Sequence, residues 1–225
     1  MRTMILYHGS PEIVQKPEYG KGKPYKDYGM GFYCTENEDL AKEWACSENS
    51  DGYVNQYVIN PLELRILNLA SREYTILHWL ALLMKFRQIR VSSPVMRRSV
   101  EWLIENYLPD IDRFDAIVGY RADDSYFSFA RAFANNEISL RQLSYAMRLG
   151  GLGEQFVLKS EKAFSLIRFV SSMEVPYVIY FPKRKQRDDN ARAAFREELE
   201  REDLDGLFIR DIVREGIQPD DPRLQ

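Results

Sequence analysis

Two histidines restrict the chemistry open to this sequence. His8 ends a short apolar segment and precedes Gly9, whereas His78 lies among apolar residues in a helical pattern. A catalytic zinc ion needs three protein ligands, and the sequence contains no His-Glu-x-x-His, Gly-x-Ser-x-Gly or P-loop motif. Zinc hydrolases, serine hydrolases of that motif and P-loop nucleotidases are therefore excluded. We expect His8 to act at a site and His78 to be a packing residue.

Three short segments hold the other residues suited to chemistry. They are residues 6–10 (LYHGS), 28–35 (YGMGFYCT) and 154–158 (EQFVL). Trp44 lies beyond the second segment, eleven residues after Tyr33. Gly29 and Gly31 form a Gly-x-Gly pair, but a predicted strand follows them rather than a helix N-terminus. The pair therefore does not predict the phosphate loop of a dinucleotide-binding fold.

In these segments the sequence resembles the catalytic core of ADP-ribosyltransferases of the diphtheria-toxin and poly(ADP-ribose) polymerase branch, the His-Tyr-Glu group. In that group a strand ending in His-Gly-Ser or His-Gly-Thr is followed by a long loop and a Gly-x-Gly strand that carries a tyrosine. An aromatic residue stands eleven positions after this tyrosine, and a glutamate opens a later strand. His8, Tyr33 and Trp44 occur here in that order, with a long loop over residues 11–29.

The resemblance implies an activity, a co-substrate and a set of site residues. The whole chain also resembles a bacterial family of ADP-ribosyltransferase-like proteins that are often encoded beside a small partner gene in a toxin–antitoxin arrangement. A mono-ADP-ribosyltransferase is implied, with NAD as co-substrate, no metal, a protein or nucleic-acid acceptor, a role as a toxin and a small antitoxin protein as partner. The implied catalytic residues are His8, Tyr33, Gln155 and Glu154, and the implied NAD-binding residues are Gly9, Ser10, Tyr33 and Trp44.

The chemistry of NAD explains why these residue types suit such a site. Its nicotinamide ring is a flat cation, and aromatic faces such as those of Tyr33 and Trp44 attract a cation by about 0.5–2 kcal/mol each. Gly9 has no Cβ, so its backbone can approach the carboxamide closely. His8 can hydrogen-bond a ribose hydroxyl, and we expect the loop over residues 11–29, with Lys21 and Lys23, to lie over the pyrophosphate.

The sequence departs from the family pattern at the glutamate. Gln155 takes its place, and Glu154 stands one position early. Neighbouring strand residues point to opposite faces, so only one of the two can face the pocket. Gln155 can hold a ribose hydroxyl but supplies no negative charge. Met30 and Ala41 also replace a lysine and a serine of many polymerase-branch members, which favours a mono-transferase over a polymerase.

Two alternatives stay open beside this interpretation. A catalytically inactive module that binds NAD or ADP-ribose would have the same pocket, and Gln155 as the inward residue would favour it. The NAD-dependent RNA 2′-phosphotransferases share the fold but use additional histidine and arginine residues, whereas only His8 is available here. The sequence does not identify the acceptor.

Alternating apolar segments and helical periods predict the elements that position these residues. Predicted strands cover residues 3–7, 31–35, 53–59, 64–69, 115–120, 155–158, 166–170 and 177–181. A helix is predicted from a Thr35–Glu38 capping box to about residue 47, and a second from a Ser71 cap to about residue 88. Further predicted helices cover residues 96–108, 139–149, 189–202 and 207–214.

This interleaving predicts an α+β fold, and the resemblance implies the split β-sheet core of an ADP-ribosyltransferase with an inserted helical hairpin. We expect an ADP-ribosyltransferase-like domain over residues 1–182, with the hairpin at about residues 71–108. A charged helical extension should follow over residues 183–225.

Composition limits the surroundings in which the protein acts. Lys and Arg number 31 against 34 Asp and Glu, a net charge of -3, so we expect no strong nucleic-acid binding. Cys34 and Cys46 cannot build a disulfide framework, which favours a reducing compartment. The longest apolar stretch, residues 77–84, is too short to span a bilayer. We expect a cytoplasmic protein without a membrane partner.

Overall fold

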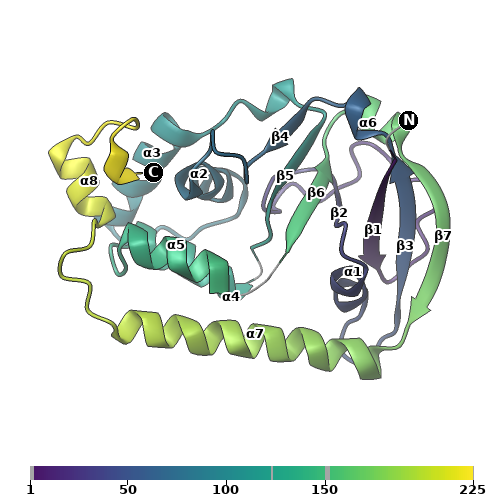
Figure 1. The fold of residues 1–225 in the computed structure, drawn as a ribbon. Helices are drawn as coiled ribbons and strands as arrows, with labels where there is room; N and C mark the ends of the chain where they lie inside the picture. Colours follow the sequence, from purple (N-terminus) through teal and green to yellow (C-terminus); the bar gives the residue numbers. More distant parts are fainter. Residues whose placement is uncertain (1–2, 123, 150–152, 225) are drawn as a thin grey trace. The chain divides into compact units, whose positions relative to one another are not determined.

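The computed structural model describes residues 3–122, 124–149 and 153–224 (Figure 1). Strands and helices alternate along it, so the predicted α+β class is confirmed. The residues form two compact units. The first comprises Met1–Ala70, Asp110–Arg121 and Leu152–Arg187, and the second comprises Ser71–Pro109, Ala122–Gly151 and Asp188–Gln225.

Two sheets make up the first unit. One has the order β1 (Met4–Ser10), β3 (Gly52–Ile59), β7 (Arg168–Val175), with antiparallel pairing throughout. The other has the order β2 (Phe32–Cys34), β6 (Glu154–Leu158), β5 (Ala116–Tyr120), β4 (Ile66–Asn68), with only β4 and β5 parallel. Tyr7 and Thr35 exchange backbone hydrogen bonds of 2.8 and 2.9 Å, so β1 is linked to the end of β2.

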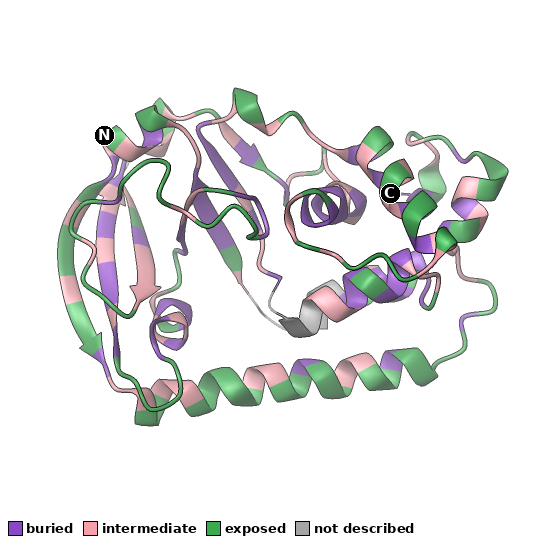
Figure 2. Cartoon of the chain, turned by 180° about the vertical axis from the view of Figure 1, so that it is seen from behind, coloured by how far each residue is buried: buried purple, intermediate pink, exposed green. Residues whose placement is uncertain are grey.

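The core of the first unit is apolar side chains from both sheets. Its fully buried members include Leu6, Cys34, Tyr57, Ala116 and Leu158. The side chains at alternate positions of β2 and β6 point away from this core, toward the opposite face of the second sheet. Figure 2 shows β5 and β6 buried along most of their lengths. A short helix, α6 (Glu161–Leu166), precedes β7.

Helix α1 (Glu38–Ala45) packs directly on β1 and β3. A Cβ on Gly9 would lie 2.0 Å from the carbonyl oxygen of Ala41, and one on Gly52 would lie 2.1 Å from that of Ala45. Both glycines therefore allow the helix backbone to approach the sheet. The predicted Thr35–Glu38 capping box is wrong: the Asn37 side chain accepts a hydrogen bond from Leu40 N at 3.1 Å.

Two predictions about strands are also wrong. The first strand does not end at residue 7 but continues to Ser10, because β3 supplies hydrogen-bonding partners over its whole length. A longer strand, β7, lies where the sequence predicts a strand over residues 166–170. Helix α7 (Tyr177–Glu200) begins where the sequence predicts a strand over residues 177–181. The aromatic run at 177–181 has helical spacing, because Tyr177, Tyr180 and Phe181 all pack against the cluster under α1.

Helices make up the second unit. These are α2 (Ile76–Phe86), α3 (Pro94–Tyr107), α4 (Asp124–Ala134), α5 (Leu140–Leu149), α8 (Ile209–Glu215) and the part of α7 beyond residue 187. The helical insertion expected at about residues 71–108 thus clusters with α4, α5 and the C-terminal residues. Short 3-10 turns at Pro61–Glu63, Ile111–Arg113 and Pro222–Leu224 complete the described elements.

Helix α2 is buried on more than one side, as its apolar circumference predicts (Figure 2). Its cap is Thr75 rather than the predicted Ser71, because Thr75 and His78 form reciprocal bonds at the first turn. Helix α3 packs against it. In the part of the chain that the structure describes, helices long and apolar enough for a bilayer are absent.

Candidate functional site

His8 and Tyr33 line one cavity of about 390 Å³ in the first unit. The loop between β1 and β2 forms much of its wall, together with Phe32 and Phe164. The loop contributes four lysines, Lys16, Lys21, Lys23 and Lys26. We call this the lysine-lined cavity. Glu18 also lines the cavity and pairs with Lys21 at 3.3 Å, and the positive charge that remains suits a small anionic or polyphosphate ligand.

His8 is held as a neutral imidazole. Its Nδ1 donates to the carbonyl oxygen of Tyr33 at 2.7 Å, and its ring lies 4.3 Å from that of Phe32. Burial, with a further contribution from the charge of Lys26, lowers the pKa of His8 to about 4. Because Nδ1 carries the proton, Nε2 is an acceptor at neutral pH.

Asn55 fixes the loop that follows His8. Its side chain is fully buried on β3, opposite His8 in register. Its Oδ1 accepts from Val14 N at 2.9 Å, and its Nδ2 donates to His8 O at 3.3 Å and to Ser10 Oγ at 3.2 Å. The Ser10 hydroxyl in turn donates to Glu12 O. Ser10 is thus engaged in holding the loop, and the strand pattern of the sequence gives no signal for the role of Asn55.

Tyr33 supports a tight loop and presents its ring to a cation. Its hydroxyl donates to Gly29 O at 2.6 Å and accepts from Tyr28 N at 3.1 Å. Gly29 has φ +72°, a conformation that favours glycine. The Lys26 ammonium lies 4.7 Å from the centre of the Tyr33 ring. The ring face is therefore a cation site.

Lys159, the residue after β6, holds the same loop. Its ammonium donates to Tyr28 O at 2.6 Å and to Met30 O, and burial lowers its pKa to about 8. The Met30 side chain is exposed and is not among the residues that line the cavity. Sequence reasoning missed Lys159, because nothing in its neighbourhood marks it as a partner of a loop that far away along the chain.

Trp44, on α1, also faces a protein cation. The Arg121 guanidinium lies 4.8 Å from the centre of its ring. The indole Nε1 is buried and has no hydrogen-bond partner among the described residues. Gly9, by contrast, lies against the backbone of α1, and a side chain at this position would collide with that backbone. Packing alone thus requires glycine there, whatever else its backbone contacts.

Gln155, not Glu154, is the inward residue of β6. Glu154 is exposed, whereas Gln155 is 4% exposed. Val157 pairs with Tyr33, and Gln155, two residues away, lies on the same face. Its Nε2 donates to Asp27 Oδ2 at 3.2 Å, and its Oε1 is buried with no partner in the described ranges.

Asp27 supplies a buried carboxylate beside this glutamine. It is 4% exposed and comes from the loop between β1 and β2, 128 positions away from Gln155. Sequence reasoning missed it, because a lone aspartate in a loop rich in glycine and lysine has no distinctive spacing. The structure therefore places a negative charge next to the position where a glutamate was expected.

Lys26 interacts with His8, the Tyr33 ring, Asp27 and Arg121. Burial lowers its pKa, Asp27 opposes that shift, and Lys23 and Arg121 add to it. Its own charge lowers the pKa of His8. The imidazole, the Tyr33 ring, the Asp27 carboxylate and the Arg121 guanidinium are thus grouped around one ammonium.

The other histidine lies outside this group. His78 Nδ1 accepts from Thr75 N at 3.0 Å, and its ring packs edge-on against Tyr74 and Tyr107. The prediction of a packing residue is confirmed. Across residues 3–122, 124–149 and 153–224, no group of three or more His, Cys, Asp or Glu side chains is placed to hold a metal ion.

The fold and the site define an α+β protein with a lysine-lined cavity formed by β1, β2, α6 and the loop between β1 and β2. Residues 4–169 match a protein family described as a protein of unknown function, DUF3990, and the chain belongs to that family. Curated proteins and solved structures gave no match to the chain.

Proposed function

We propose that the protein is an NAD-dependent mono-ADP-ribosyltransferase that acts on a protein or nucleic-acid acceptor. The observation that carries this proposal is the grouping of His8, the Tyr33 ring and the Gln155–Asp27 pair around Lys26. His8 and Tyr33 are the residue types of the His-Tyr-Glu group in its chain order, and Gln155 stands where that group has its glutamate. An aspartate here adds the charge that Gln155 lacks.

The residues present fit NAD in three respects. Protein cations lie over the rings of both Tyr33 and Trp44, so these faces attract positive charge as a nicotinamide ring requires. Trp44 Nε1 and Gln155 Oε1 are a buried donor and a buried acceptor without partners among the described residues. An amide or hydroxyl of a ligand would remove the cost of leaving them unpaired. The lysines of the cavity suit a pyrophosphate.

Each residue has a task that follows from its surroundings. NAD supplies the ADP-ribosyl group, and cleavage of its glycosidic bond develops positive charge on the ribose. His8 Nε2 accepts a hydrogen bond from a ribose hydroxyl, because the other ring nitrogen is committed to Tyr33 O. Gln155 orients a second hydroxyl, and the Asp27 carboxylate behind it stabilises the developing charge. The acceptor loses a proton as it bonds to the ribose carbon that nicotinamide leaves.

A second function is favoured by one observation. Gln155 is the buried residue and Glu154 is exposed, so no glutamate lies on the inward face of β6. A module that binds NAD or ADP-ribose without cleaving it does not need a glutamate at this position. The two functions differ in a single measurable respect, the release of nicotinamide.

The experiment is to incubate the purified protein with NAD and follow nicotinamide by chromatography, with NAD binding measured in parallel by calorimetry. For a transferase we expect release that is suppressed in His8→Ala and Tyr33→Ala and retained in Glu154→Gln, a control at an exposed neighbour. Binding without release supports the non-catalytic module. Absence of NAD binding, with both variants indistinguishable from wild type, contradicts both functions.

The biological setting is part of the proposal. A mono-ADP-ribosyltransferase in the cytoplasm of a bacterium would act as a toxin, and a small antitoxin protein would restrain it. Expression of wild type in a bacterial host should slow growth, and His8→Ala should relieve the defect at equal protein level. Equal toxicity of both proteins would contradict a role for the activity.

A further inference from the structure

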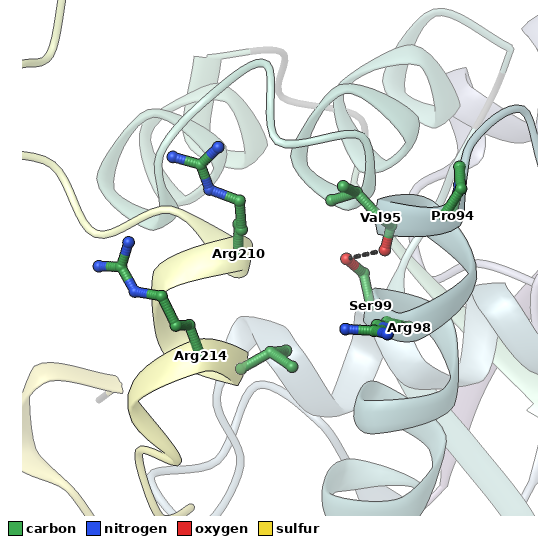
Figure 3. Close-up of a pocket in the computed structure, with 7 residues that line it drawn as sticks. Pro94, Val95, Arg98, Ser99, Arg210 and Arg214 are labelled. Carbon is green, nitrogen blue, oxygen red and sulfur yellow. Dashed lines mark hydrogen bonds between the residues drawn. The ribbon is translucent and has the colours of Figure 1, made fainter.

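The second unit holds a cavity that the proposed NAD chemistry does not use. It has a volume of about 370 Å³ and is lined by α3 and α8. Figure 3 shows Arg98 on α3, with Arg210 and Arg214 on successive turns of α8. We call it the arginine-rimmed cavity.

The rim carries positive charge that the described residues neutralise only in part. Arg210 and Arg214 are four residues apart and therefore share one side of α8. Arg214 forms ion pairs with Asp211 at 3.0 Å and Glu215 at 3.3 Å. Within the described part of the chain, neither Arg98 nor Arg210 forms an ion pair, and both are exposed. Two guanidinium groups at one rim are thus available to carboxylates, which they bind through paired hydrogen bonds.

The floor of the cavity is apolar. Pro94, Val95 and Val213 contribute aliphatic surface. Ser99, the uncharged polar residue of the lining, already donates its hydroxyl hydrogen to Val95 O at 2.8 Å (Figure 3). Small polar ligands are usually recognised by several convergent polar groups inside a pocket. An apolar centre with a charged rim is instead typical of a protein–protein interface.

We propose that the arginine-rimmed cavity docks an acidic polypeptide segment of a partner protein. One aliphatic or aromatic side chain of that segment enters between α3 and α8, and flanking carboxylates pair with Arg98 and Arg210. A cavity of about 370 Å³ has room for an anchoring side chain rather than a folded element. Single-stranded nucleic acid is disfavoured, because it is held by stacking on aromatic rings and the described lining residues include none.

The test begins with a library of random peptides displayed on phage and selected on the full-length protein. We expect enriched sequences with an apolar residue flanked by aspartate or glutamate. A selected peptide, labelled for fluorescence anisotropy, should bind the double variant Arg98→Glu/Arg210→Glu about a hundredfold more weakly than wild type. Arg97→Glu is the matched control, since Arg97 is exposed on α3 but does not line the cavity. It should change the affinity by less than about threefold.

Two further measurements separate docking from simple charge attraction. Replacing the apolar anchor of the peptide by serine should weaken binding by about tenfold. A peptide with lysine in place of its acidic residues should bind the double variant better than wild type, which also shows that the variant is folded. Selection without an acidic consensus, binding that survives in the double variant, or full displacement of the peptide by equimolar inorganic phosphate or by a single-stranded RNA overturns the proposal.

Discussion

The lysine-lined cavity and the arginine-rimmed cavity differ in the polar groups that lie beside them. The four lysines that line the first are exposed, but Asp27, Gln155 and Asn55, which contact its loop and do not line the cavity, are buried and fixed by hydrogen bonds. In the second, the guanidinium groups are exposed and the floor is aliphatic. Buried polar groups are costly to fold and suit a site that must stabilise charge in a ligand. Exposed charges around an apolar floor cost little and suit a surface that selects a partner.

The largest effect expected from this difference is on catalysis. Asp27→Asn keeps the shape of the side chain but removes its charge, so we expect nicotinamide release to slow by about a hundredfold. KM for NAD should change much less, because the charge acts mainly on the developing sugar cation. Steady-state kinetics measure both, with Glu154→Gln as the exposed control. An unchanged kcat would remove Asp27 from the proposed mechanism.

A stability effect should follow at Asn55. Truncation by Asn55→Ala leaves the partly buried Val14 N without its acceptor and removes the bonds from Nδ2, and we expect a loss of about 2–3 kcal/mol in the free energy of unfolding. Gln56→Ala is the matched control, because that amide is only partly buried and accepts one bond from Ser171. Urea unfolding followed by fluorescence compares the two. Equal losses would show that the loop is not held through Asn55.

Acid should lower the free energy of unfolding through the protonation of His8. The pKa of His8 is about 4 in the folded chain against an ordinary value of 6.5, so the unfolded chain binds more protons between these values. Stability is therefore full above about pH 6.5 and falls as the pH drops toward 4. Between pH 7 and pH 5 the wild type should lose about 2 kcal/mol more than His8→Gln does. Unfolding curves that shift in parallel for both proteins would contradict a neutral, buried imidazole.

The smallest effect is expected at the arginine-rimmed cavity. Arg98→Ala and Arg210→Ala remove exposed side chains without ion pairs in the described chain, so each should change the free energy of unfolding by less than about 0.5 kcal/mol. Peptide binding should nevertheless fall in both. Thermal unfolding and anisotropy on the same samples make the comparison. A large loss of stability would mean that these arginines serve the fold rather than docking.

Local patterns in the sequence predict much of the fold. The alternation of β3, the apolar circumference of α2 and the position of His8 before Gly9 are properties of neighbouring residues, and periodicity reports them directly. The sequence wrongly predicts a strand at the start of α7. Tyr177, Tyr180 and Phe181 are residue types that favour strands, but their spacing is that of one face of a helix. Packing of these rings under α1 decides between the two.

The residues of the candidate site also fall into those that local motifs predict and those that they do not. His8 and Tyr33 are marked by short motifs, and they line one cavity. Asp27 and Lys159 are not marked, because each acts on a partner more than a hundred positions away. Such contacts depend on how the sheets pack, and one sequence carries no periodic signal for them.

By itself, the sequence determined the class of fold, the identities of the imidazole and phenol that meet in one cavity, and the substitution of glutamine for the expected glutamate. Only the tertiary structure decided that Gln155 rather than Glu154 points inward, that Asp27 stands against it, and that arginines from α3 and α8 share one rim. The physical reason is range. Residue spacing dictates which face of a helix or strand a side chain occupies, whereas the burial of those faces against distant elements determines which side chains meet.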